Sequence, residues 1–140
     1  MTSREGPFAL HPIGWVESTL TDRHLAPCQG DEGAPEACLV FGPEVSEGLR
    51  NLRPGDEVIV LTWLDRADRD VLAVHPRGDL ARPLTGVFST RSPDRPNPVG
   101  LHRVEIVSAE GTRFLVRSLE ALDGTPIVDV KPVLDPHTER

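Results

Sequence analysis

Apolar and polar residues alternate with a period of two along most of the chain, which is the pattern of half-buried β-strands. Residues 56–65 show it most clearly, with one face formed by Val58, Val60, Thr62 and Leu64. Val71 and Ala73 continue the alternation into the next segment. Residues 103–107 and 113–119 alternate in the same way, and Ala109-Glu110-Gly111 turns the chain between them. We therefore expect strands in all of these segments and a hairpin in the last two.

Two further elements complete the predicted pattern. Asp123-Gly124 is a strong tight-turn dipeptide, and a short strand from Pro126 to Val130 follows it. The clearest helix candidate is 43–52, because Pro43 suits a first helical position and one face carries Val45, Leu49 and Leu52. Residues 22–35 are polar and aperiodic, which predicts a long loop. Short strands with turn signals between them predict an all-β protein, an antiparallel barrel or sandwich, with one short helix and long loops.

Composition sets the organisation of the chain. Its 140 residues, without internal repeats, predict a single domain over 1–140. The apolar fraction of 38% and the charged fraction of 26% are typical of globular proteins. No apolar run approaches the roughly 18 residues of a membrane span, and the first residues do not resemble a signal peptide. We therefore expect a cytoplasmic protein whose two cysteines, Cys28 and Cys38, are reduced.

Charge is distributed unevenly. The net charge of −7 argues against a protein that coats nucleic acid non-specifically. Residues 17–57 carry nine acids against three arginines, whereas residues 75–103 carry five arginines against two aspartates. The basic stretch includes an unusual proline-rich segment, although a short window can also become basic by chance.

That segment runs from Gly86 to Leu101 and contains three prolines within six residues. Proline excludes helix and central strand, so the segment is expected to be a stiff loop that offers backbone carbonyls to a ligand. Arg91 and Arg95 add cations suited to carboxylate or phosphate, and Asn97 adds a donor and an acceptor. The alternative is a rigid surface loop with solvated arginines.

A second cluster lies at residues 122–132. On a strand, Asp129 and Lys131 project to the same face, so the only lysine of the chain would neighbour a carboxylate. Such a carboxylate could orient a substrate or accept a proton, and the alternative is an exposed ion pair of little energetic consequence. Familiar nucleotide, phosphate and zinc-protease motifs do not occur, and the five histidines lack metal-ligand spacing. No metal is expected.

Together these residues resemble the TrmO family, also called TsaA-like or YaeB-like, of S-adenosylmethionine-dependent tRNA methyltransferases. The resemblance is carried by Gly86 to Leu101, by Leu122 to Pro132 and by His11 to Ser18, which in order and spacing cover nearly the whole chain. It implies a single-sheet antiparallel β-barrel and a homodimer with the cofactor near the subunit interface. The methyl acceptor in the family is N6 of a threonylcarbamoyl-adenosine beside the tRNA anticodon.

The resemblance also implies roles for individual residues. Cofactor contacts carry over to Pro27, Cys28, Gln29, Asp65, Arg66, Arg91, Leu101, Leu122, Asp123, Gly124 and Thr125. Arg95 and Asn97 are expected to contact the acceptor. Because the acceptor nitrogen must lose a proton, Asp129 is the candidate general base, oriented by Lys131.

The sequence departs from the family pattern in three places. It has Leu64-Asp65-Arg66 where many members have an aromatic-His step, and Val133 where they have tyrosine. It is also expected to lack the additional C-terminal domain of longer members. Three functions therefore stay open: tRNA methylation, methylation of a small molecule, and S-adenosylmethionine binding without chemistry.

Overall fold

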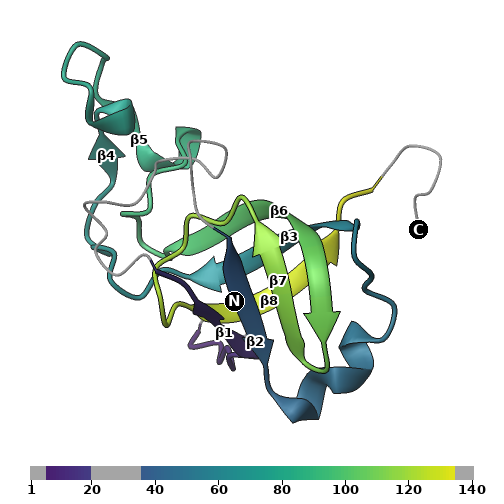
Figure 1. The fold of residues 1–140 in the computed structure, drawn as a ribbon. Coiled ribbons are helices and arrows are strands. Elements are labelled where there is room, and N and C mark those ends of the chain that lie inside the picture. The colour runs from purple at the N-terminus through teal and green to yellow at the C-terminus, as the bar shows by residue number, and fades with distance from the viewer. Residues whose placement is uncertain (1–5, 20–35, 135–140) are drawn as a thin grey trace.

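Six antiparallel strands form a closed barrel in the computed structural model, which describes residues 6–19 and 36–134 (Figure 1). The order around the barrel is β1-β2-β7-β6-β3-β8, and β8 pairs back onto β1. The strands are β1 (Gly14–Glu17), β2 (Ala37–Phe41), β3 (Glu57–Trp63), β6 (Val99–Glu110), β7 (Arg113–Arg117) and β8 (Pro126–Pro132). The predicted all-β barrel is confirmed. None of the helices in the described ranges is both long and apolar enough to cross a bilayer.

The period of two explains why these segments close around one core. In β3, Val58, Val60 and Thr62 are buried, and the residues between them face outward. In β6 the inward positions are Gly100, His102, Val104 and Ile106. Strand β7 adds Phe114, whose ring meets that of Phe41 edge-on at 5.8 Å between centroids. The β6–β7 hairpin was predicted, and so was the turn at Asp123-Gly124, where Gly124 has a φ of 82°.

Part of the chain between β3 and β6 forms a small lobe outside the barrel. Strands β4 (Ala73–Val74) and β5 (Thr85–Gly86) pair only with each other, and β4 is not buried in the barrel. The short turns η3 (Pro76–Gly78) and η4 (Val87–Ser89) belong to the same lobe. Figure 1 shows the lobe projecting to one side of the barrel. The strand predicted from the alternation of Val71 and Ala73 is present as the two residues Ala73–Val74, and it lies outside the barrel.

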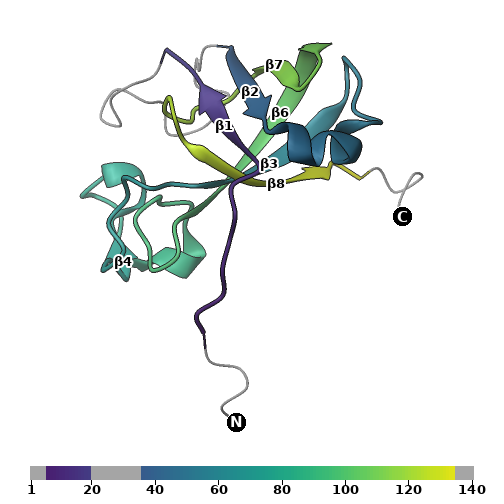
Figure 2. The same ribbon diagram turned by 90° about the horizontal axis from the view of Figure 1, so that it is seen from below.

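The predicted helix over 43–52 is shorter and of another type. Element η2 (Pro43–Leu49) is a 3-10 helix, with proline in its first turn. Val45, Leu49 and Leu52 nevertheless pack against the barrel core, as their spacing predicted. Figure 2 shows η2 at one end of the barrel, and residues 6–12 running away from it as an exposed segment.

Strand direction sorts the connections between the two ends of the barrel. One end contains the last residues of β1, β3 and β7 and the first residues of β2, β6 and β8, as the registers Glu17↔Cys38 and Trp63↔Val99 indicate. The connections β1–β2, β3–β6 and β7–β8 all leave from this end, which we call the loop end. The opposite end contains η2 and the β6–β7 turn.

Candidate functional site

Nearly all the predicted cofactor residues belong to connections at the loop end. Asp65, Arg66 and Arg91 belong to the β3–β6 connection, and Leu101 lies just inside β6. Leu122 to Thr125 form the turn before β8. Pro27, Cys28 and Gln29 belong to the β1–β2 connection but lie outside the described residues. The fold therefore brings together segments far apart in sequence, because antiparallel neighbours alternate their connections between the two ends.

The β3–β6 connection is tied together at its base. The Leu64 amide donates to the Pro98 carbonyl at 2.8 Å, and the Arg95 amide donates to the Asp68 carbonyl at 3.0 Å. The Asp68 amide in turn donates to Oδ1 of Asp94 at 2.9 Å. The turn that carries Asp65 and Arg66 is thus held beside the proline-rich segment. Both Asp65 and Arg66 are exposed.

Arg95 fastens the proline-rich segment internally. Its Nη2 donates to the carbonyls of Val87 and Thr90, each at 2.6 Å, and its Nε donates to the Ser92 carbonyl at 2.8 Å. The carbonyls that the sequence left available to a ligand are thus partly occupied by the segment's own arginine. A guanidinium fork can satisfy several acceptors at once, which explains the stiffness of this loop. The predicted contact of Arg95 with an acceptor stays a prediction.

Arg91, by contrast, is exposed and carries no hydrogen bond or ion pair in the described part of the chain. It follows the Thr90 turn, where the Thr90 amide and hydroxyl both donate to the Val87 carbonyl. Val87 itself is fully buried. Arg91 therefore offers its donors to solvent or a ligand from an anchored backbone.

Arg69 is a site residue that the sequence analysis missed. Its guanidinium lies over the Trp63 ring, 5.1 Å from the centroid. It also donates to the Pro96 carbonyl at 2.7 Å and to Oδ1 of Asn97 at 3.0 Å. The amide oxygen of Asn97, a predicted acceptor contact, is therefore engaged by Arg69. The Trp63 to Arg69 spacing could not predict this stacking, because it depends on how the turn between them folds.

The 122–125 turn is fixed to the end of β1. The Gly124 amide donates to the Val16 carbonyl at 2.7 Å, and the Thr125 hydroxyl donates to the Leu122 carbonyl at 2.7 Å. Oδ1 of Asp123 accepts from the Ser18 amide at 3.0 Å. Asp123 thus holds the chain where it leaves β1.

The predicted Asp129 and Lys131 pair exists. Lys131 Nζ lies 3.3 Å from Oδ2 of Asp129, and Oδ1 accepts from the Val130 amide at 2.9 Å. Both side chains are exposed on the outer face, at 64% for lysine and 48% for aspartate. In the barrel register Leu61 is flanked by Asp129 on one side and Leu101 on the other. The carboxylate is therefore one strand away from a predicted cofactor contact.

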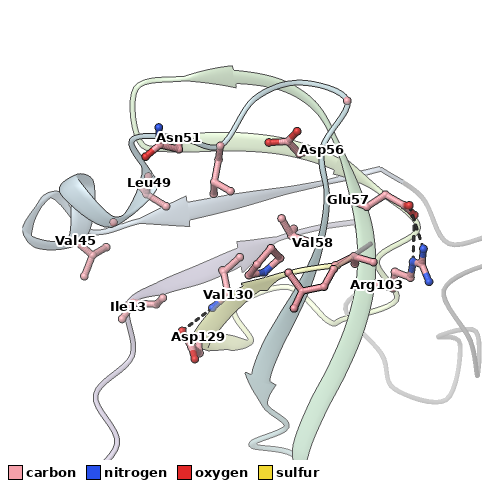
Figure 3. A pocket seen from close by; sticks show the side chains of 16 residues that line it. Ile13, Val45, Leu49, Asn51, Asp56, Glu57, Val58, Arg103, Asp129 and Val130 are labelled. Atoms are coloured by element: carbon pink, nitrogen blue, oxygen red, sulfur yellow. Dashed lines mark hydrogen bonds and ion pairs between the residues drawn. The ribbon is translucent and has the colours of Figure 1, made fainter. Parts of the chain in front are cut away.

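Two open hollows on the described part of the chain lie near predicted site residues. The larger, about 840 Å³, lies beside η2 and contains Asp129 but no predicted cofactor residue (Figure 3). The smaller, about 760 Å³, lies near the loop end and adjoins Asn97 and Arg69. Its other lining residues are Gly6, Pro7, Phe8, Leu10, Pro12, Trp63, Val99, Pro126 and Val128. None of the described residues predicted to contact a cofactor lines either hollow. We therefore assign the candidate site to the loop end, where the strand connections that carry those residues lie, beside the smaller hollow.

Ion pairs on the outer face of the barrel lower the pKa of two carboxyl groups. Hydrogen bonding to Arg113, with its charge, lowers the pKa of Glu17 below its ordinary value of 4.5. Arg103 lowers the pKa of Glu57 in the same way, and Figure 3 shows this pair at the rim of the larger hollow. The Glu57–Arg103 pair links the paired strands β3 and β6, and the Glu17–Arg113 pair links β1 to β7 across β2. Among the described residues, no group of three or more potential metal ligands occurs.

Comparisons with known proteins agree on one family. Residues 15–137 match the family described as the tRNA-methyltransferase O N-terminal domain. An S-adenosyl-L-methionine-binding protein of Archaeoglobus fulgidus is 43% identical over 122 residues, covering 87% of this chain and 86% of its own. A probable S-adenosyl-L-methionine-binding protein of Methanothermobacter thermautotrophicus is 44% identical over 123 residues, covering 88% of each chain.

Solved structures agree with these relatives. A TrmO of Pseudomonas aeruginosa superposes with a TM-score of 0.71 at 26% identity. The match covers 92% of this chain but 57% of that one, so the chain spans little more than half the length of the TrmO structure.

Proposed function

The chain belongs to the family of the tRNA-methyltransferase O N-terminal domain, and from this membership we propose that it binds S-adenosylmethionine at the loop end. The observation that carries the proposal is the convergence there of the β3–β6 connection, Leu101 and the 122–125 turn. Relatives more than 40% identical are named for binding the same compound.

The residues at the loop end fit this cofactor chemically. Its carboxylate requires a cation, and the Arg91 guanidinium is exposed on a buttressed turn. Its hydroxyl and amino groups require acceptors, and the exposed 123–124 turn and the second oxygen of Asp123 supply them. The hollow beside the loop end, about 760 Å³, is lined by the predicted acceptor contact Asn97, and its volume is within the range of about 300–1,000 Å³ typical of small-molecule sites.

We further propose that the protein is a methyltransferase acting on N6 of threonylcarbamoyl-adenosine in tRNA. The cofactor, when bound, supplies an electrophilic methyl group. The chain's own contribution is to orient the acceptor, exclude water and remove the N6 proton. Asp129 lines the larger hollow, but it is separated from Leu101 by one residue, Leu61, in the strand register. Its Oδ2 accepts that proton, and Lys131 at 3.3 Å keeps the carboxylate oriented. Arg95 and Asn97 place the acceptor, from a segment that internal hydrogen bonds make stiff.

A second copy of the chain completes the proposed site. Val99 and Leu101 remain 41% and 47% exposed on the outer face of β6. Covering these apolar side chains would bring a second protomer against Leu101, which is itself a proposed cofactor contact. Equilibrium sedimentation tests this homodimer directly, and a monomer at assay concentration contradicts it.

Two assays separate the open functions. Calorimetry with S-adenosylmethionine measures binding, and labelled methyl transfer to tRNA with and without the threonylcarbamoyl group measures chemistry. We expect binding, and transfer to the modified tRNA only. Transfer to small molecules alone would favour the second function, and binding without any transfer would favour a binding module.

The Asp129→Asn variant isolates the proposed base. We expect unchanged cofactor affinity and a loss of transfer of about 100-fold or more, the usual contribution of a positioned base. Glu105→Gln is the matched control, because it neutralises a carboxylate on the same outer surface that only pairs with Arg117. Full transfer by Asp129→Asn would remove Asp129 from the mechanism.

A further inference from the structure

Three polar side chains form a hydrogen-bonded chain inside the barrel. The Thr62 hydroxyl lies 2.7 Å from Nε2 of His102, and Nδ1 of His102 lies 2.8 Å from Oε1 of Glu120. Thr62 is 0% exposed, and the side chains of His102 and Glu120 are 4% and 19% exposed. The group belongs to none of the roles assigned above, although burying it is expensive unless it is fully paired.

The hydrogen-bond roles follow from the donors available. A carboxylate only accepts, so Nδ1 carries the proton that it donates to Glu120. In a neutral ring Nε2 is then the acceptor, and the Thr62 hydroxyl donates to it. No buried side-chain nitrogen or oxygen in the described ranges lacks a partner. The chain is therefore fully satisfied and fixes the ring orientation.

The hydroxyl, the imidazole and the carboxylate follow one another in the order of a catalytic triad, but they do not act as a catalytic triad. A nucleophilic hydroxyl must reach a substrate, and Thr62 is completely covered. Gly100 lies opposite Thr62 in the β3–β6 register, and a Cβ there would come within 2.7 Å of Nε2. Backbone thus closes over the hydroxyl and the ring.

The position of the chain in the fold indicates a different role. His102 directly follows Leu101, and Glu120 precedes the 122–125 turn by two residues. The β6–β7 ladder ends at the pair Glu105↔Arg117. After Arg117 the chain no longer pairs with β6. Among the described residues, the His102–Glu120 hydrogen bond is then the only hydrogen bond between β6 and residues 118–122. This bond therefore spans the two segments to which cofactor contacts are assigned.

We propose that His102 is a positioning residue for cofactor binding, which it supports by holding Glu120 and so setting the 122–125 turn relative to Leu101. The inference rests on the proposed binding of S-adenosylmethionine. Leu119 and Ala121 on either side of Glu120 are buried, so a change at Glu120 is transmitted to the turn through a packed backbone. The Thr62 hydroxyl fixes the ring from the opposite side.

Substitutions at Glu120 test the proposal. Glu120→Ala removes the acceptor of the Nδ1 proton, whereas Glu120→Gln keeps an oxygen in its place. Calorimetry with S-adenosylmethionine should show affinity about tenfold weaker for Glu120→Ala, in the range of indirect coupling between sites. It should show wild-type affinity, within about threefold, for Glu120→Gln and for the control Glu105→Gln. Equal affinity of Glu120→Ala and wild type would overturn the proposal.

A spectroscopic measurement on the wild-type protein is independent of whether Glu120→Ala folds. The ¹⁵N shifts of the His102 ring report its tautomer and hydrogen bonds, and we expect them to move when S-adenosylmethionine is added. Unchanged shifts on a saturated protein would mean that the ring only supports the core, against the proposal. If the wild-type protein does not bind S-adenosylmethionine, the proposed function itself fails, a result distinct from either outcome for His102.

Discussion

Replacing Gly100 with alanine places a methyl group in the most crowded part of the barrel. Gly100 is an inward position of β6, opposite Thr62. The new Cβ would come within 2.7 Å of Nε2 of His102 and within 3.2 Å of Cδ2 of Leu64, and it would overlap the Thr62 hydroxyl oxygen. Thr62 and His102 are hydrogen-bonded to each other at 2.7 Å, so neither can move without disturbing that bond.

The expected loss of stability has two parts. Inserting one carbon into a packed core costs about 1–3 kcal/mol. Separating the Thr62 hydroxyl from His102 leaves buried polar atoms without partners, which costs about 1–3 kcal/mol more. We expect the free energy of unfolding to fall by about 2–5 kcal/mol, a large share of the roughly 5–15 kcal/mol of a typical domain.

Urea denaturation followed by tryptophan fluorescence measures this loss, because Trp63 lies at the adjacent strand end. Gly48→Ala is the matched control: its Cβ would meet nothing within 4 Å, and its φ is not in the left-handed region. We expect the free energy of unfolding of Gly48→Ala to lie within about 1 kcal/mol of the wild-type value. A Gly100→Ala protein as stable as this control would refute the packing argument.

Three other measurements test the site and its surroundings. Arg91→Ala should weaken S-adenosylmethionine binding about tenfold or more, the contribution of a charged hydrogen bond, and calorimetry showing unchanged affinity would exclude the contact. Arg95→Lys retains the charge, but a lysine cannot reach the carbonyls of residues 87, 90 and 92 together. Amide hydrogen exchange should therefore accelerate across this segment. Protection equal to that of the wild type would contradict the proposed role of the Arg95 hydrogen bonds. The folded-state pKa of Glu17 is lowered, so its stabilising effect is present above pH 4.5 and is lost as the pH falls through that lowered pKa. The thermal midpoint of Glu17→Gln should therefore fall less than that of wild type between pH 5 and pH 3, and parallel curves would contradict the Arg113 pairing.

The fold could be predicted to a large extent because its signal is local. Alternating apolar residues such as Val58 and Val60 place one face of a strand in the core. The Asp123-Gly124 turn depends only on the backbone preferences of its own residues. The prediction was wrong in detail where local signals compete. Val71 and Ala73 alternate like a core strand, but the chain leaves the barrel after Trp63 and the alternation ends in the lobe.

The candidate site was only partly predictable. The pairing of Asp129 with Lys131 followed from their spacing on one strand, and the structure has it at 3.3 Å. The difference between two nearby arginines did not follow, since Arg95 is engaged by carbonyls of its own segment while Arg91 is exposed. Both are arginines of one short segment, so only the path of the loop distinguishes their roles.

By itself the sequence determined the barrel strands β3, β6, β7 and β8 and the turn before β8, since each depends on a few neighbouring residues, whereas β1 and β2 were not predicted. The tertiary structure decided which of them meet. Closure of the barrel placed three connections at one end, turned Gly100 toward Thr62, and joined His102 to Glu120 across a gap in the strand ladder. These contacts join residues that are far apart in sequence, and only the register of the paired strands determines which of them meet.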